Sequence, residues 1–243
     1  MNFEDAKLNI LLISIHGLIR GQDLELGRDA DTGGQTKYVV ELLSALAERP
    51  EVGQVDLMTR RIVDTNVSED YAEPVEQLSD TARIIRIDCG EEGYLPKEVL
   101  WDSLDNFADN ALVFLNSQAR LPDIIHSHYA DAGYVGTRLS HQLNIPLLYT
   151  GHSLGRTKRK RLLASGVKRD VIEQRYNISR RIDAEEEALG VAERIITSTN
   201  QEIIEQYGMY DYYTPEKMRV VPPGTDLEKF HPVDGSERDS TIY

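Results

Sequence analysis

Short apolar runs rich in Ile, Val and Leu alternate with longer amphipathic stretches along almost the whole chain. Runs that are apolar on both faces are typical of parallel strands buried under crossover helices. The alternation therefore predicts an α/β protein with a doubly wound, mostly parallel, Rossmann-like sheet. Strands are predicted over 8–15, 55–59, 82–89, 124–129, 146–152, 194–199 and 218–221, and helices over 34–49, 96–118, 132–144, 167–191 and 200–207.

The same pattern predicts the domain organisation. A chain of 243 residues can make one large domain or two small ones. Strand and helix recur without an internal linker, so residues 1–231 are predicted to form one domain. Only segment 232–243 changes in composition, and we expect it to be a linker. In doubly wound sheets ligands bind at the carboxyl ends of the strands, so the site residues are expected there.

Charge and cysteine content exclude several classes of partner. The net charge of −14 and the pI of about 4.9 argue against nucleic acid and anionic membranes as partners, so any bound anion must be met by a local cluster of cations. Cys89 is the only cysteine, which excludes an internal disulfide and favours a cytoplasmic location. The first apolar run, Leu8–Ile15, is too short for a membrane span and is predicted to be a buried strand.

The first strand-to-helix connection is unusually long, from His16 to about Gly33, which suggests that it covers a ligand. It ends in Thr32-Gly33-Gly34-Gln35, where two glycines would let an oxyanion approach the free N–H groups of the next helix. The alternative is a glycine turn that only starts a helix. The segment Asp29-Ala30-Asp31 could be mistaken for a metal-binding D-x-D pair, but short acidic pairs before a helix are common, and no metal site is predicted.

Polar residues also follow the strand at 124–129. Strand alternation places His126 and His128 on the same face, and no third or fourth zinc ligand is found at suitable spacing. A structural or substrate hydrogen-bonding role is therefore expected for the two histidines. Asp131 lies at the switch from strand to helix, where a carboxylate can cap the helix or accept hydrogen bonds from sugar hydroxyls.

A basic island follows the strand at 146–152. Residues 156–181 contain ten basic and two acidic residues inside an otherwise acidic chain, which predicts a focused anion site. The alternative, a solvated helix face, accounts for several of these cations. Adjacent guanidinium groups at Arg180 and Arg181 suit a phosphate, although they can also pair with the acidic segment 183–187.

Seven segments together resemble the N-terminal half of the sucrose-phosphate synthase family, retaining glycosyltransferases of the two-Rossmann, GT-B type. They are ISIHGLIRGQDLELGRDADTGGQTKYVVEL, YLPKEVLW, IIHSHYADAGYVG, TGHSLGRTK, ISRRIDAEE, ITSTNQEI and VVPPGTDLEKF. The resemblance covers about Leu8 to Phe230. GHSLG followed by the lysine, and the RRI-AEE helix, narrow it to the sucrose group.

The resemblance implies transfer of glucose from UDP-glucose to fructose 6-phosphate, giving sucrose 6-phosphate. The acceptor is expected to bind this half, with Gly33, Gly34 and Gln35 lining the cleft beside the donor phosphate. His152 would hydrogen-bond the transferred sugar, and Asp131 or Tyr129 would lie near the reacting groups. Four cations are expected to hold the acceptor phosphate: Lys97, Lys158, Arg180 and Arg181. In this family positive groups are thought to stabilise the departing diphosphate, so neither a protein nucleophile nor a cofactor is expected.

One departure from the family pattern limits the expected activity. The second Rossmann domain of the family supplies the groups that grip UDP and the donor sugar, and these groups are not found in this chain. The chain is therefore expected to be a truncation or a natural half, inactive by itself. Three alternatives stay open: a sucrose synthase with a free-fructose acceptor, a mannosylfructose-phosphate synthase, and a non-catalytic sugar-phosphate-binding module.

Overall fold

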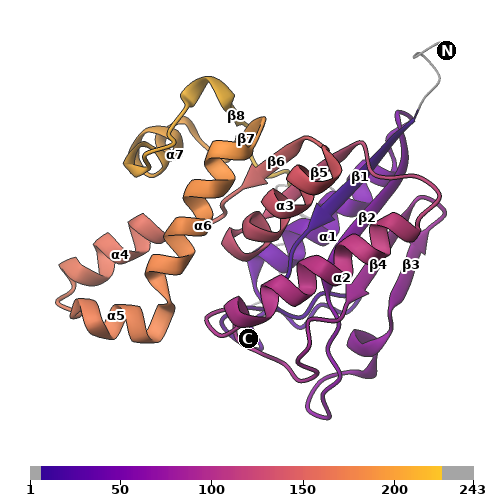
Figure 1. Cartoon of the computed structure of the whole chain (residues 1–243), viewed down its shortest axis with the longest axis horizontal. Helices are drawn as coiled ribbons and strands as arrows, with labels where there is room; N and C mark the ends of the chain where they lie inside the picture. Colours follow the sequence, from indigo (N-terminus) through magenta and orange to yellow (C-terminus); the bar gives the residue numbers. More distant parts are fainter. Residues whose placement is uncertain (1–6, 226–243) are drawn as a thin grey trace, which may run out of the picture.

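The computed structural model describes residues 7–225, and its centre is one eight-stranded sheet (Figure 1). Seven of the strands lie where the sequence predicts strands, each to within a few residues. The α/β fold class is thus confirmed. The strands are β1 (Leu8–Ile13), β2 (Val52–Arg60), β3 (Val75–Ser79), β4 (Ala82–Ile87), β5 (Ile124–His128), β6 (Leu147–Thr150), β7 (Arg194–Thr197) and β8 (Met218–Val220).

The strand order reverses its direction in the middle of the sheet, and doubly wound folds bind ligands in a crevice at such a point. The order is β3-β4-β2-β1-β5-β6-β7-β8, and every pair except β3 with β4 is parallel. The connections from β1 run to one side and those from β5 to the other, so the topological switch lies between these strands. Ile13 at the end of β1 pairs with Ser127 of β5, which brings the loops that follow the two strands together.

Helices cover both faces of the sheet and create two separate cores. Along β1, Leu11 and Ile13 belong to the core under α2, α3 and α6, whereas Leu12 belongs to the core under α1. This alternation is the two-residue period of a strand that is buried on both faces. The helices are α1 (Gly34–Ala47), α2 (Leu104–Ser117), α3 (Ala130–Leu143), α4 (Gly155–Ala164), α5 (Arg169–Tyr176), α6 (Ile178–Val191) and α7 (Asn200–Glu205), with short 3-10 turns at η2 (Glu69–Ala72), η3 (Leu100–Ser103), η4 (Tyr207–Met209) and η5 (Pro215–Lys217).

The predicted helix over 167–191 is wrong in one respect, because it is two helices that meet at Asn177. This residue has φ 45° and ψ 41°, a left-handed conformation that ends α5 and starts α6. Asn tolerates this region better than most residues, and its Nδ2 donates to the backbone oxygen of Glu98 at 2.6 Å. The preceding basic stretch forms α4, and Figure 1 shows α4 and α5 extending from the sheet as a hairpin. The predicted helix over 96–118 begins later, with η3 and then α2.

The edge strand β3 is absent from the sequence-based prediction. Its residues alternate between exposed and half-buried, and its apolar content is low. β3 is nevertheless attached to its neighbour in the sheet by a side-chain ion pair, because Arg86 of β4 donates to Glu76 Oε2 at 2.5 Å. Glu76 Oε1 in turn accepts from the backbone N–H of Gly21 at 2.8 Å, which attaches the long loop after β1 to this edge.

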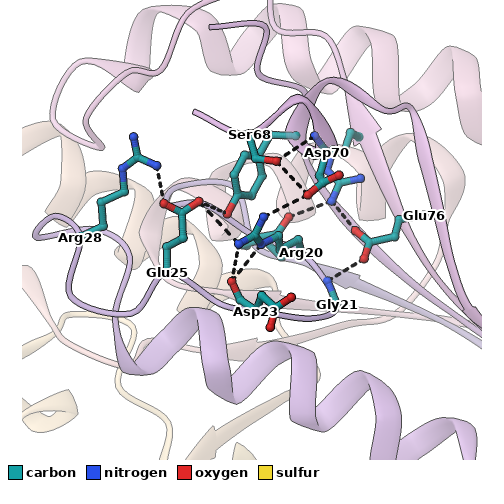
Figure 2. A network of polar contacts seen from close by, with 11 residues as sticks. Arg20, Gly21, Asp23, Glu25, Arg28, Ser68, Asp70 and Glu76 are labelled. Carbon is teal, nitrogen blue, oxygen red and sulfur yellow. Dashed lines mark hydrogen bonds and ion pairs between the residues drawn. The ribbon is translucent and has the colours of Figure 1, made fainter. Parts of the chain in front are cut away.

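Figure 2 shows the polar network that holds the loop after β1. Arg20 donates to Asp70 at 3.0 Å and to the backbone oxygen of Asp23, and Glu25 accepts from the Tyr71 hydroxyl at 3.0 Å. A Cβ at Gly21 would overlap with the side chain of Leu78, so the loop approaches β3 as closely as a glycine allows. The network makes the long connection a fixed part of the fold.

The predicted linker, 232–243, and the end of the predicted domain, 226–231, lie outside the described residues. None of the helices within 7–225 combines the length and the apolar character that crossing a bilayer requires.

Candidate active site

The start of α1 forms one wall of the crevice. Apart from the adjoining residues and the backbone of α1 itself, a Cβ at Gly33 or Gly34 would meet no protein atom within 4 Å, so open space faces this turn. The first N–H groups of α1 have no hydrogen-bond acceptor within the helix, because no helical residue precedes them by four positions. They point out of the N-terminus of the helix, where they can bind an anion. Gln35 donates from Nε2 to Ser14 Oγ at 3.2 Å and to the backbone oxygen of His128 at 3.4 Å. The predicted glycine turn therefore lies at the β1–β5 switch.

The acidic pair before α1 is occupied by protein contacts. Asp29 Oδ1 accepts from the backbone N–H groups of Asp31 and Thr32, both at 2.7 Å. Burial opposes the charge, but these hydrogen bonds hold the pKa of Asp29 below its ordinary value. Asp31 is buried and binds the ammonium group and the backbone N–H of Lys97. Within 7–225, no group of three or more His, Cys, Asp or Glu residues is arranged to hold a metal ion.

Asp131 lies buried in the first turn of α3, and it binds a histidine that the sequence reasoning did not select. Its Oδ2 lies 2.7 Å from His16 Nδ1, and its Oδ1 accepts from the backbone N–H of Ala132 at 2.6 Å. The His16 ring meets Tyr129 edge-on, with centroids 4.5 Å apart. Asp131 thus binds a backbone N–H of its own helix and also orients His16. The signal for His16 was its position directly after the first strand.

Two buried histidines, His126 and His128, and the half-buried His152 line up beside this pair. The His126 and His128 rings lie on one face with centroids 4.1 Å apart, which confirms the prediction from alternation. His128 Nδ1 lies 3.0 Å from Nε2 of His152, and Tyr38 of α1 meets the His152 ring edge-on at 5.1 Å. Burial lowers the pKa of His126 to about 3 and that of His152 to about 4. All three rings are therefore neutral at pH 7, because burial also lowers the pKa of His128.

A cationic corner formed by Lys97, Lys158 and Arg181 lies next to the histidines. The two ammonium groups reach one oxygen of Glu98, at 3.5 Å for Lys97 and 3.9 Å for Lys158. Lys158 also lies over the Tyr176 ring, 3.9 Å from its centroid. Burial and the neighbouring charges of Arg181 and Lys97 lower the pKa of Lys158, and the opposing effect of Glu98 and Asp31 does not cancel this shift. The charged form of Lys158 is therefore under-compensated in this structure.

Arg181 forms the floor of the cationic corner. Its guanidinium carbon lies 4.4 Å from the Tyr129 ring centroid, its Nε donates to Glu185 Oε1 at 2.8 Å, and its NH2 group donates to the Ser153 backbone oxygen at 2.5 Å. Glu185 also accepts from the backbone N–H of Gly155. Although burial opposes the charge, Glu185 and other neighbours raise the pKa of Arg181. The residue is thus held rigidly, which keeps its charge in place beside Tyr129.

The structure separates the two adjacent arginines. Arg180 is half exposed and donates to Asp102 at 2.6 Å and to the Trp101 backbone oxygen at 2.9 Å. These partners lie on η3, whereas Arg181 contacts the start of α4. Of the four cations expected to hold a phosphate, the structure brings Lys97, Lys158 and Arg181 together and directs Arg180 elsewhere.

Several other cations of the basic island line hollows that are separate from one another. His152, Ser153, Thr157, Lys158 and Arg161 line a hollow at the end of β6. A separate hollow, called here the outer hollow, is lined by Arg156, Arg159 and Lys160 of α4 and by Arg169 of α5. Arg156 is already paired with Glu186 and Asp211. The island is therefore not one site, and Arg161 is a site-facing cation that the sequence reasoning did not select.

Comparisons with known proteins agree with this architecture. The family described as the sucrose synthase first GT-B domain matches residues 5–233. The chain is 44% identical to sucrose-phosphate synthase 4 of Arabidopsis thaliana, over 97% of the chain and 26% of that protein. It is also 44% identical to the sucrose-phosphate synthase of Zea mays, over 92% of the chain and 25% of that protein. The chain thus spans about a quarter of the length of these curated relatives.

A solved structure extends the similarity to three dimensions. The sucrose-phosphate synthase of Thermosynechococcus elongatus superposes with a TM-score of 0.74 at 30% identity, over 93% of this chain and 51% of that chain. The starch synthase IV catalytic domain of Arabidopsis thaliana, 14% identical with a TM-score of 0.58, shares the fold. The chain therefore belongs to the sucrose synthase first GT-B domain family and is similar to sucrose-phosphate synthases.

Proposed function

We propose that this chain is the acceptor-binding domain of a sucrose-phosphate synthase, and that the acceptor is fructose 6-phosphate. The observation that carries the proposal is that the positive charge of Lys158 has no close carboxylate partner. Its charge is opposed by burial and by Arg181 and Lys97, while its nearest carboxylate oxygen, on Glu98, is 3.9 Å away. A phosphate dianion in the hollow beside Lys158 would compensate this charge through charge-assisted hydrogen bonds.

The remaining groups around the crevice fit a sugar. Gly33 and Gly34 leave room for a ligand at the start of α1, where N–H groups can meet an oxyanion. Aromatic rings and neutral imidazoles stand next to the cations, and they supply the apolar surface and single hydrogen bonds that sugar rings use. The transfer we propose breaks the bond between glucose C1 and the diphosphate of UDP-glucose and forms a bond from C1 to an acceptor hydroxyl. The hydroxyl proton leaves with the diphosphate, so no covalent bond to the protein is required.

The chain's own residues would serve this reaction by position and charge. Arg181, fixed by Glu185 and Ser153, would hold positive charge beside Tyr129, and Asp131 would keep His16 oriented at the crevice. Preorganised donors of this kind stabilise charge that develops in a transition state. We propose that the donor, UDP-glucose, binds mainly through the second domain that this family carries, and that the protein acts in the cytoplasm.

Calorimetry with fructose 6-phosphate, fructose and inorganic phosphate tests the acceptor. Fructose 6-phosphate is expected to bind, and fructose to bind much more weakly. Lys158→Ala is expected to weaken fructose 6-phosphate binding about tenfold or more, since a hydrogen bond to a charged group contributes roughly 1.5–3 kcal/mol. The matched control is Arg159→Ala, which removes a cation from the outer hollow and should change little.

Two results would overturn the proposal. Equal losses for Lys158→Ala and Arg159→Ala would mean diffuse electrostatics instead of a built site. Equal affinity for fructose and fructose 6-phosphate would favour the free-fructose acceptor of a sucrose synthase, the protein for which the matched family is named.

A further inference from the structure

Two neutral imidazoles share one hydrogen bond at the edge of the crevice. His128 lies at the end of β5, His152 follows β6, and the bond joins His128 Nδ1 to His152 Nε2 at 3.0 Å. The ring centroids are 5.2 Å apart, and the planes are inclined by 35°. A neutral imidazole has one donor nitrogen and one acceptor nitrogen, so one of these rings donates and the other accepts.

The surroundings of His128 decide the direction of this hydrogen bond. Its other nitrogen, Nε2, is buried and has no partner among the residues of the described segment. If the proton were on Nε2, the structure would contain a buried N–H without an acceptor, and such groups are rare and costly in native proteins. With the proton on Nδ1, the unpartnered atom is a lone pair, which proteins tolerate better. His128 therefore donates, and His152 accepts on Nε2.

We propose that His128 is a positioning residue that fixes His152 as the Nδ1–H tautomer, so that His152 offers a hydrogen-bond donor to the cleft. Since Nε2 of neutral His152 is the acceptor in the shared bond, its proton must be on Nδ1. The ring is held further by Tyr38, which meets it edge-on, and by the left-handed backbone of His152, with φ 55°.

The fixed tautomer determines which ligand groups fit beside His152. This residue lines the same hollow as Ser153, Thr157, Lys158 and Arg161, where the two cations offer only donors and the hydroxyls can also donate. An imidazole that donated nothing would add an acceptor to a wall whose other side-chain acceptors are the hydroxyls of Ser153 and Thr157 and the amide oxygen of Gln206. With Nδ1 protonated, the hollow suits ligands rich in acceptor oxygens, such as phosphates, carboxylates and sugar hydroxyls that accept. The inference concerns the cleft of the proposed function, but the tautomer is a property of the ligand-free chain.

Long-range proton–nitrogen NMR of the chain labelled with ¹⁵N-histidine tests the proposal directly. The chain has six histidines, and the His152 signals are assigned by their loss in His152→Asn. In the wild-type chain at pH 7, His152 is expected to show a protonated Nδ1 and an unprotonated Nε2, with the other tautomer at about one tenth or less. A protonated Nε2 on His152 would overturn the proposal, whether or not the chain binds a sugar phosphate.

Variants of His128 separate positioning from simple packing. His128→Phe keeps a ring but removes the donor, so His152 is expected to become a mixture of tautomers. His128→Gln supplies an amide N–H that can donate to His152 Nε2, and the Nδ1–H form should return. His141→Gln, on the exposed surface of α3, is the control and should leave the His152 signals unchanged. A pure Nδ1–H tautomer in folded His128→Phe would refute the role of His128; if His128→Phe does not fold, the wild-type and His128→Gln spectra still decide.

Discussion

Lys97 and Lys158 reach the same carboxylate oxygen, Glu98 Oε1, at 3.5 and 3.9 Å. Lys97 also has Asp31 as a close partner, whereas Lys158 has no carboxylate nearer than Glu98 within residues 7–225. Glu98 would therefore compete with a bound anion for interaction with the ammonium group of Lys158. The backbone oxygen of Glu98 accepts from Asn177, so the α5–α6 junction is tied to the backbone that carries this carboxylate.

Replacement of Glu98 by Gln should strengthen the binding of fructose 6-phosphate. Removal of the carboxylate leaves the positive charge of Lys158 without a negative partner. The phosphate then binds without having to weaken the ion pair between Lys158 and Glu98. An ion pair of this exposure contributes roughly 0.2–1 kcal/mol, so the affinity should rise by a factor of about 1.4 to 5. Calorimetry with fructose 6-phosphate measures this change in affinity. Glu41→Gln, which removes the partner of Lys37 on the surface of α1, is the control. Unchanged or weaker binding in Glu98→Gln would contradict the competition.

The buried histidines should make the chain less stable in mild acid. Burial lowers the pKa of His126 from 6.5 to about 3, so the unfolded chain binds the proton more readily than the folded chain. The stabilisation from His126 is complete above pH 6.5 and decreases as the pH falls below that value toward 3. At pH 5 the loss from this residue is on the order of 2 kcal/mol in the free energy of unfolding.

Urea unfolding at pH 7 and pH 5 measures this loss. In His126→Asn, whose amide can still bond Thr150, the difference between the two pH values should be about 2 kcal/mol smaller than in the wild-type chain. The exposed His141→Gln is the matched control, and its pH difference should equal that of the wild type. If the free energy of unfolding decreased equally from pH 7 to pH 5 in all three chains, His126 would not be the cause of the loss of stability.

The sequence predicts the sheet well because its central strands are buried on both faces. Leu11, Leu12 and Ile13 are consecutive apolar residues, and all three are buried. The edge strand β3 is not predictable by the same rule, because Leu78 is its only inward apolar residue and Glu76 is held by Arg86. The break at Asn177 is equally hidden, since the segment around it is polar and compatible with a continuous helix.

Site residues are predictable only where the local sequence carries a signal. The double glycine before α1 and the spacing of His126 and His128 are local signals. His16 carries none beyond its position, because its partner Asp131 is 115 residues away. Arg180 and Arg181 cannot be distinguished from sequence, since successive helix residues point about 100° apart and only the packing of α6 shows which one faces Tyr129.

The helix junction at Asn177 should tolerate Gly better than Ala. Both substitutions lose the hydrogen bond to Glu98, but only Ala must also enter the left-handed region with a Cβ, which costs about 1–2 kcal/mol. Thermal or urea unfolding of Asn177→Gly and Asn177→Ala should show this difference. If the two variants were equally stable, the junction would have rearranged in Asn177→Ala. The distance between Glu98 and Lys158 would then also change.

The buried pair of His16 and Asp131 should be energetically coupled. Asp131→Ala leaves Nδ1 of His16 and the backbone N–H of Ala132 without their partner, and His16→Ala leaves Oδ2 of Asp131 unpaired in a buried place. Each single substitution should therefore cost about 3 kcal/mol in the free energy of unfolding. The double substitution removes both orphaned groups of the pair, so it should cost roughly 1–3 kcal/mol less than the sum of the two. Urea unfolding of the four chains gives the coupling energy, and a coupling of zero would mean that the two side chains are held separately, with His16 oriented by Tyr129 alone.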